Sequence, residues 1–198
     1  MESNLLLIED ALRLAEIRLT EKLGKTVNIG FKTYLDQKTI EKMTKIDHEK
    51  FRSELWYSSD ELLEKSLKKD FLCLIVHLNG APAAFLYGYD DEFDSHWFFL
   101  DEIATRVEGK GIGKMLIVLL LVYCFELGYT FVTLYTEEHD EKGRRLRDFY
   151  EHLGFTYMST DPEVGVIMKY KIDEQELAKL YNRVMYSEGG PHPPYLKP

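Results

Sequence analysis

Three glycines at alternate positions, Gly109, Gly111 and Gly113, stand in the stretch from Thr105 to Lys114 and are the first residues that could do chemistry. Glycine has no side chain, so the backbone N–H groups of such a stretch stay open to a ligand. The N-terminus of a following helix adds a partial positive charge. This combination is typical of a phosphate or pyrophosphate site. A tight glycine turn that binds nothing is the alternative interpretation.

Two common nucleotide-binding loops do not fit this stretch. The Walker pattern G-x-x-x-x-G-K-[ST] needs one more residue between Gly109 and Gly113 and a hydroxyl residue after Lys114, where a methionine stands. The dinucleotide fingerprint G-x-G-x-x-G needs a glycine at position 114 or 116, and these positions hold lysine and leucine. A nucleotide-binding switch protein is therefore a disfavoured alternative.

The stretch does resemble the acetyl-CoA loop of the GNAT superfamily of N-acetyltransferases, written Q/R-x-x-G-x-G/A after a strand and before a helix. Residues 108–116, EGKGIGKML, are similar to the common family sequence RGKGIGKxLL. The resemblance implies that main-chain amides of this loop bind the pyrophosphate of acetyl-CoA. The cofactor-binding residues that it implies are Ile103, Ala104, Thr105, Gly109, Lys110, Gly111, Ile112, Gly113 and Lys114.

A second, independent motif lies 39 residues after Gly111, where Tyr150 belongs to the sequence FYEHLGF of residues 149–155. This motif resembles the GNAT pattern [FLY]-Y-E-x-x-G-F. In the family the tyrosine lies near the thioester sulfur, so the resemblance implies that Tyr150 is the general acid that protonates the departing thiolate. Without the resemblance, the same residues read as the end of a helix whose aromatic side chains pack in the core.

Two departures from the family pattern accompany these motifs. Glu108 takes the Q/R position, where a carboxylate must point away from a diphosphate, and Arg106 fits the pattern in a shifted register. The family often has an asparagine a few residues before the second motif, whereas residues 137–143, EEHDEKG, contain none. Arg144 or Arg145 is then a candidate to contact the cofactor instead.

The strand before the glycine loop carries the residues that must meet the thioester. The resemblance implies that a backbone N–H near Ile103 or Ala104 polarises the acetyl carbonyl. The attacking amine must lose a proton, so a carboxylate is expected nearby, and Asp101 and Glu102 precede this strand end. Successive strand residues face opposite ways, so only one should line the site unless a bulge intervenes, and we favour Glu102. Other candidates are Glu137, Glu138 and His139.

The periodicity of the chain predicts a single α/β domain with a mixed sheet and helices on both faces. Helices are expected over 4–23, 38–56, 59–69, 111–126, 143–153 and from Asp173 to about Tyr186, and strands over 27–35, 71–78, 83–89, 97–105, 129–136, 155–159 and 164–172. The resemblance implies a GNAT fold with about seven strands. The expected division is a helical extension (1–26), the acetyltransferase domain (27–172), and a C-terminal helix with a Pro-rich tail (173–198).

Composition restricts the class of protein further. The net charge of −9 argues against binding to nucleic acid and favours a cationic substrate. Cys73 and Cys124 lie in apolar runs without metal-ligand spacing, which predicts buried thiols in a reducing compartment. The N-terminus lacks the basic region of a signal peptide, and the apolar run 115–125 is shorter than the ~20 residues of a membrane span. A cytoplasmic location is therefore expected.

The sequence thus predicts an acyltransferase that moves the acetyl group of acetyl-CoA directly to a primary amine, either a small cationic amine or an amine of a peptide or protein. Neither cysteine lies in a motif with a histidine partner, so no covalent intermediate is expected, and neither is a metal. The acidic turn 89–94 could attract a cationic acceptor or be an ordinary solvated hairpin. A homodimer is compatible with this class. The alternative function is a non-catalytic GNAT-fold module that binds CoA or regulates a partner.

Overall fold

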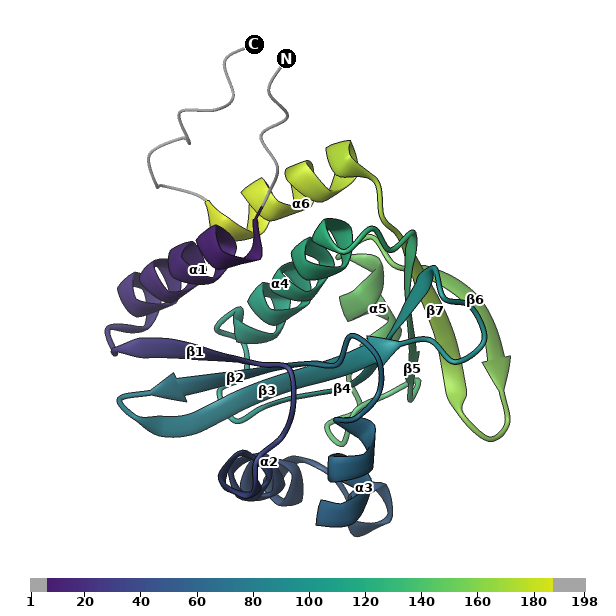
Figure 1. The fold of residues 1–198 in the computed structure, drawn as a ribbon, viewed down its shortest axis with the longest axis horizontal. Helices are drawn as coiled ribbons and strands as arrows, with labels where there is room; N and C mark the ends of the chain where they lie inside the picture. The colour runs from purple at the N-terminus through teal and green to yellow at the C-terminus, as the bar shows by residue number, and fades with distance from the viewer. Residues whose placement is uncertain (1–6, 187–198) are drawn as a thin grey trace.

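The computed structural model describes residues 7–186, which form a seven-stranded mixed sheet in the order β1-β2-β3-β4-β5-β7-β6 (Figure 1). Neighbouring strands are antiparallel except for β4 and β5, which are parallel. The strands are β1 (Val27–Lys32), β2 (Leu72–Leu78), β3 (Ala81–Asp90), β4 (Trp97–Thr105), β5 (Phe131–Thr136), β6 (Thr156–Asp161) and β7 (Gly165–Lys171).

Helices cover both faces of the sheet, as the sequence predicted (Figure 1). They are α1 (Ile8–Leu23), α2 (Gln37–Lys50), the 3-10 turn η1 (Ser53–Leu55), α3 (Ser59–Lys65), α4 (Ile112–Glu126), α5 (Leu146–Glu151) and α6 (Glu174–Met185). Helices α2 and α3 lie on one face, and α1, α4 and α6 lie on the other. None of the helices within residues 7–186 is both long and apolar enough to cross a membrane.

Helix α4 is the centre of the larger core. It is apolar on all sides, which is typical of a helix without a solvent face. Its side chains from Met115 to Cys124 are buried because the sheet covers one side and α1 and α6 cover the others. Helix α1 contributes a stripe of Ala11, Ala15 and Leu19 at helical spacing. The N-terminal extension and the C-terminal helix therefore share one core with the sheet.

Short-range sequence signals set several element ends. The Ser58 side chain accepts from the Glu61 amide (3.2 Å) and the Glu61 carboxylate accepts from the Ser58 amide (2.7 Å), which is a capping box at the start of α3. Asn79 and Gly80 have φ angles of 49° and 82°, as a two-residue hairpin turn requires. Asp173 caps α6. The predicted start of the last helix at Asp173 is confirmed.

Three predicted helices are shorter than expected. The helix predicted over 59–69 ends at Lys65, and Ser66 is its C-cap. The helix predicted over 38–56 ends at Lys50, because Phe51 turns to an extended conformation and packs against the core under α2 and α3. The helix predicted over 143–153 begins at Leu146, because the Asp140 carboxylate accepts from the amides of residues 142 and 144 and holds a loop there. The Pro-rich tail and the first residues of the predicted helix 4–23 lie outside the described residues.

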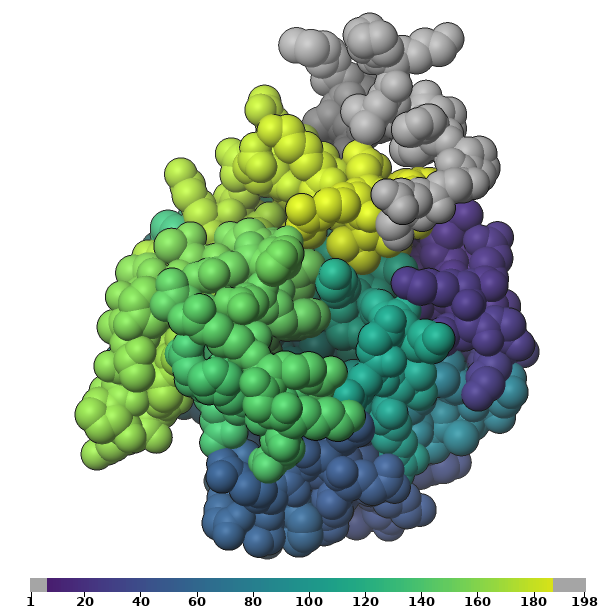
Figure 2. Space-filling view, turned by 180° about the vertical axis from the view of Figure 1, so that it is seen from behind, coloured from purple at the N-terminus to yellow at the C-terminus, as the bar shows by residue number. Residues whose placement is uncertain are grey.

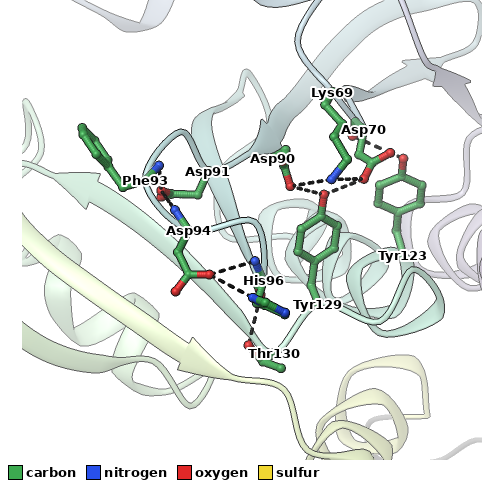
Figure 3. Close-up of polar contacts among 10 residues, drawn as sticks. All are labelled: Lys69, Asp70, Asp90, Asp91, Phe93, Asp94, His96, Tyr123, Tyr129 and Thr130. Carbon is green, nitrogen blue, oxygen red and sulfur yellow. Dashed lines mark hydrogen bonds and ion pairs between the residues drawn. The ribbon is translucent and has the colours of Figure 1, made fainter.

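The turn between β3 and β4 is fixed by internal polar contacts (Figure 3). The Tyr129 hydroxyl lies 2.6 Å from carboxylate oxygens of both Asp70 and Asp90, and the Lys69 ammonium lies 3.2 Å from Asp90. Residues 90–94 do not line the large cleft of the molecule. Their carboxylates hold the turn, away from that cleft.

Candidate functional site

The parallel strands β4 and β5 separate at one end. They pair from Trp97 with Phe131 to Leu100 with Leu134, and no pairing follows although both strands continue. The opening leads into a cleft of about 1770 Å³. Figure 2 shows this face, which is hollowed between the green segment that contains α5 and the teal segment near residue 110. An extended ligand can enter between the two strands and bind the free backbone edge of either.

The structure brings together almost all the residues implied for the cofactor. Those that line the cleft are Ile103, Thr105, Gly109, Lys110, Gly111, Ile112, Gly113 and Lys114. Ala104 is the exception, because its methyl group is buried in the core on the α2/α3 side and only its backbone faces the neighbouring strand.

The glycine loop ends in an uncapped helix N-terminus. Gly111 is the N-cap of α4 with a φ of 86°, a left-handed conformation that favours glycine. Among the described residues, no side chain accepts a hydrogen bond from the first-turn amides of α4. These amides and the helix dipole together form a site that suits a phosphate group.

Glu108 lines the cleft, but its carboxylate is bound by cations that lie outside the glycine loop. Its carboxylate lies 2.8 Å from Lys50, 2.6 Å from Lys142 and 3.0 Å from Arg144. The hydrogen bonds from Lys142 and Lys50 lower the pKa of Glu108 to about 2, so the carboxylate is charged at neutral pH. Arg106 also turns away and donates to the Pro82 carbonyl (2.9 Å) and to a carboxylate of α2. The shifted register therefore brings no arginine to the loop.

We expect Glu108→Gln to lower the melting temperature of the free protein and to increase its stabilisation by CoA. The substitution leaves the cations Lys50, Lys142 and Arg144 close together without their common partner, so they repel one another, and an added anion relieves the repulsion. Thermal shift with and without CoA measures both effects. A CoA-induced shift that is smaller than in the wild type would contradict this expectation.

A bulge in β4 changes which way its acidic residues face. Tyr87 of β3 pairs with Glu102, but the next residue, Gly88, pairs with Leu100, so Asp101 is an extra residue. A Cβ atom on Gly88 would lie 2.4 Å from the Phe99 carbonyl oxygen, so only glycine fits opposite the bulge. Because of the bulge, Asp101 and Glu102 both face the α2/α3 side. The sequence could not decide between one and two acids on this side.

Asp101 is fully engaged. One of its carboxylate oxygens lies 2.5 Å from the Lys65 ammonium and accepts from the Tyr89 hydroxyl (2.6 Å), while the other accepts from Tyr57 (3.3 Å). Only 5% of the side chain is exposed. The Lys65 ammonium and the two hydroxyl donors occupy both carboxylate oxygens. A catalytic role of Asp101 stays a prediction, and in this structure its carboxylate links β4 to Tyr57, Lys65 and Tyr89.

The Glu102 carboxylate, in contrast to that of Asp101, has an oxygen without a hydrogen-bond partner in the described part of the chain. It lines the cleft, yet its Oε1 is buried and has no hydrogen-bond partner within residues 7–186. The same holds for Asp47 Oδ1 on α2 and for the Tyr87 hydroxyl. Burial and the negative charge of Asp47 raise the pKa of Glu102 well above its ordinary value. The sequence prediction missed Asp47, although an acid four residues after the buried Met43 on α2 was a signal.

Tyr150 lies on the opposite wall of the cleft. Its ring is buried and packs edge-on against Phe149 (5.1 Å between ring centres) and Phe155 (5.6 Å). Burial raises the pKa of the Tyr150 hydroxyl, so that it keeps its proton at neutral pH. The side chain lines the cleft, within the α5 segment that contacts the glycine loop: a Cβ atom on Gly113 would lie 3.6 Å from Phe149.

Charged residues connect the two sides of the cleft mouth. Arg52, which follows α2, contacts Glu137 and lies 3.2 Å from Glu141 in the loop after β5. Arg144 pairs with the Asp140 carboxylate, Glu138 pairs with Arg145, and both arginines line the cleft. His139 lies in an isolated bridge with Arg145 and does not line the cleft. Among the described residues, no cluster of potential ligands could hold a metal ion.

Solved structures share this fold at low sequence identity. The PaiA N-acetyltransferase from Thermoplasma acidophilum, solved with coenzyme A, is 19% identical over 73% of this chain and 99% of its own, with a TM-score of 0.59. The ribosomal-protein-S18-alanine N-acetyltransferase from Escherichia coli is 17% identical over 73% and 94%, with a TM-score of 0.57. The protein yncA from Salmonella typhimurium, solved with acetyl-CoA, is 18% identical over 74% and 95%, with a TM-score of 0.57.

A search of curated protein sequences found no match. The family model described as the acetyltransferase (GNAT) family, however, matches residues 38–155, which is more than half of the chain. The matched stretch contains the glycine loop, both acidic residues of β4 and the tyrosine of α5. The chain belongs to the acetyltransferase (GNAT) family.

Proposed function

We propose that this protein transfers the acetyl group of acetyl-CoA to a primary amine by direct attack in a ternary complex. The observation that carries the proposal is the position of the opening between β4 and β5, with the glycine loop at one end and the Glu102 carboxylate on the α2/α3 side. A pantetheine arm bound along the free edge of β4 would bring its thioester towards Glu102. The cofactors held by PaiA and yncA support this choice of ligand.

The proposed reaction uses two side chains from opposite walls. The amine gives a proton to Glu102, directly or through a water molecule, and its nitrogen attacks the thioester carbonyl. A main-chain N–H near Ile103 or Ala104 stabilises the oxyanion. When the carbon–sulfur bond breaks, the thiolate takes the Tyr150 proton, and the extra proton that remains on the new amide nitrogen passes through water to the Tyr150 phenolate. The proton on Glu102 is then released to solvent. A raised pKa suits both roles, because it makes Glu102 a stronger base and keeps Tyr150 protonated.

The acceptor that we propose is an amine that arrives as an ammonium ion, either a small cationic amine or an amine of a peptide or protein. Carboxylates and aromatic rings, which attract cations, line the cleft on the acceptor side. They are Glu102, Glu137, Tyr57, Phe99 and Tyr135. A cytoplasmic location fits the two buried free thiols. A homodimer stays a prediction that the mass in solution can test.

A two-stage experiment tests the proposed function. Thermal shift with CoA thioesters first tests cofactor binding, and assays of thiol release with a panel of amines then test turnover. Release of CoA that depends on one amine would support the proposal. Binding without any turnover over the panel would favour the non-catalytic CoA-binding module, and absence of binding by any CoA species would overturn both.

We expect Tyr150→Phe to lower kcat by roughly 10-fold or more, in the range of a general acid, and to leave the affinity for acetyl-CoA nearly unchanged. The reason is that the ring and its packing are kept while the proton donor is lost. Tyr157→Phe is the matched control, since that hydroxyl bonds to Thr160 outside the cleft. An unchanged rate for Tyr150→Phe would remove this residue from the mechanism.

A further inference from the structure

Helix α1, which precedes the stretch matched by the family model, reaches the glycine loop. It runs antiparallel to α4: at one end the Ile8 amide donates to a Glu126 carboxylate oxygen (2.8 Å), and at the other end Lys22 lies in the last turn of α1 (Figure 1). A Cβ atom placed on Gly111 would lie 3.0 Å from Lys22 Nζ. The Lys22 ammonium therefore lies directly over the glycine loop.

This ammonium is in an unfavourable electrostatic position as long as no anion is bound. The N-terminus of α4 has a partial positive charge, and its first-turn amides lack a capping side chain. Within residues 7–186, no hydrogen bond or ion pair involves Lys22 Nζ. Glu21, which precedes Lys22 in the sequence, pairs with Arg18 (3.0 Å), and Glu108, which precedes the glycine loop, pairs with Lys50 (2.8 Å).

The same region shows an excess of cations in an acidic protein. Lys110 lies within the glycine loop and Lys114 follows Gly113. Both line the cleft and, in the described part of the chain, form no ion pair. The chain as a whole has a net charge of −9, so three lysines without carboxylate partners around one loop are unusual. Such a cluster is stabilised when a multiply charged anion binds among its members.

We propose that Lys22 binds the pyrophosphate of the CoA thioester, so that the N-terminal helix completes the cofactor site. The inference rests on the proposed function and adds a residue that the family motif does not contain. It also accounts for Glu108 at the Q/R position. The cation that the motif would place there is supplied from across the loop by α1. The diphosphate is then bound on one side by the open amides of α4 and on the other by the Lys22 ammonium.

A consequence is that cofactor binding and the docking of α1 support each other. A ligand that contacts Lys22 stabilises the last turn of α1 against opening, by the same free energy that the contact adds to binding. Amide hydrogen exchange in residues 18–24 should therefore slow when CoA binds to the wild type. In Lys22→Ala this protection should be reduced, while protection of the glycine loop is kept.

Titration calorimetry of Lys22→Ala, Lys22→Arg and the control Lys25→Ala tests the inference. Lys25 is an exposed lysine just after α1 that does not line the cleft. We expect Lys22→Ala to weaken CoA binding by about 10-fold, as for loss of a hydrogen bond to a charged group, and Lys22→Arg and Lys25→Ala to bind like the wild type. The same loss is expected with dephospho-CoA, which keeps the pyrophosphate but lacks the 3′-phosphate.

The outcomes separate this inference from the proposed function. Wild-type affinity in Lys22→Ala, an equal loss in Lys25→Ala, or a loss seen with CoA but not with dephospho-CoA would each overturn the pyrophosphate assignment alone. A wild-type protein that binds no CoA species would overturn the proposed function and this inference with it. Melting temperatures without ligand control for any effect of the substitutions on α1 itself.

Discussion

Replacing Glu102 by glutamine is expected to lower kcat/KM for the amine by roughly 100-fold or more, as for the loss of a positioned general base. Glutamine keeps the shape of the side chain but cannot accept the proton of the attacking amine. Binding of acetyl-CoA should be little changed, because the cofactor loop lies at the far end of the cleft. Steady-state kinetics and calorimetry on the same preparation measure the two quantities.

Glu141→Gln is the matched control for this substitution. Glu141 is an exposed acid that lines the same cleft and pairs with Arg52 at 3.2 Å, so the same chemical change should leave kcat/KM close to the wild-type value. Comparable losses in both variants would mean that negative charge in the cleft matters and that no single base exists. That result would contradict the role of Glu102.

The difference in stability between Glu102→Gln and the wild type should depend on pH. In the unfolded chain the pKa of glutamate is about 4.3, and in the folded protein the pKa of Glu102 is raised, mainly by burial. A raised pKa means that folding opposes deprotonation, so the wild type loses stability as the pH rises through the folded-state value. Glu102→Gln should therefore unfold at a higher temperature than the wild type at neutral and alkaline pH, and the difference should vanish in acid.

Gly111→Val is expected to weaken CoA binding by at least 10-fold. Position 111 has a φ of 86°, which a β-branched residue adopts only with strain, and the new side chain would contact Lys22 Nζ and cover the amides that face the ligand. Loss of one or two hydrogen bonds to a charged diphosphate corresponds to a loss of roughly 10- to 100-fold in affinity. Calorimetry with CoA measures the effect.

Gly128→Val separates backbone strain from ligand binding. Gly128 follows the other end of α4, has a φ of 83°, and has no heavy atom within 4 Å of a Cβ position. Both variants should therefore unfold at lower temperatures by a similar amount, about 1–2 kcal/mol of strain each. Only the Gly111 variant should lose affinity for CoA. Equal losses of affinity would show that the glycine loop has no special role.

Most of the fold could be predicted from the sequence because its signals are local. The hairpin at Asn79-Gly80, the capping box of Ser58 and the continuous apolar sequence of α4 each depend on neighbours in the chain, and each agrees with the structure. The predicted ends of helices were less accurate, because a residue with helical spacing can pack into the core from outside the helix. Phe51 has an apolar side chain at helical spacing, but it packs into the core from an extended backbone.

The details of the candidate site depend on contacts between distant residues, which no local pattern contains. The motifs located the loop and Tyr150, but the choice between Asp101 and Glu102 needs the bulge opposite Gly88. Asp47 lies 55 positions before Glu102 in the sequence, so its influence on the Glu102 carboxyl follows only from the packing of α2 on the sheet.

The additional residue in β4, Asp101, changes which side chains face each side of the sheet. Before Asp101 the even-numbered side chains, Phe98 and Leu100, face α4, and after it an odd-numbered one, Ile103, does so. If all these residues were kept and β4 had no bulge, strict alternation would turn Glu102 into the aliphatic layer beneath α4 and Ile103 to the α2/α3 side. The bulge therefore places two successive carboxylates, Asp101 and Glu102, on one face of β4, where a regular strand would divide them between the two faces.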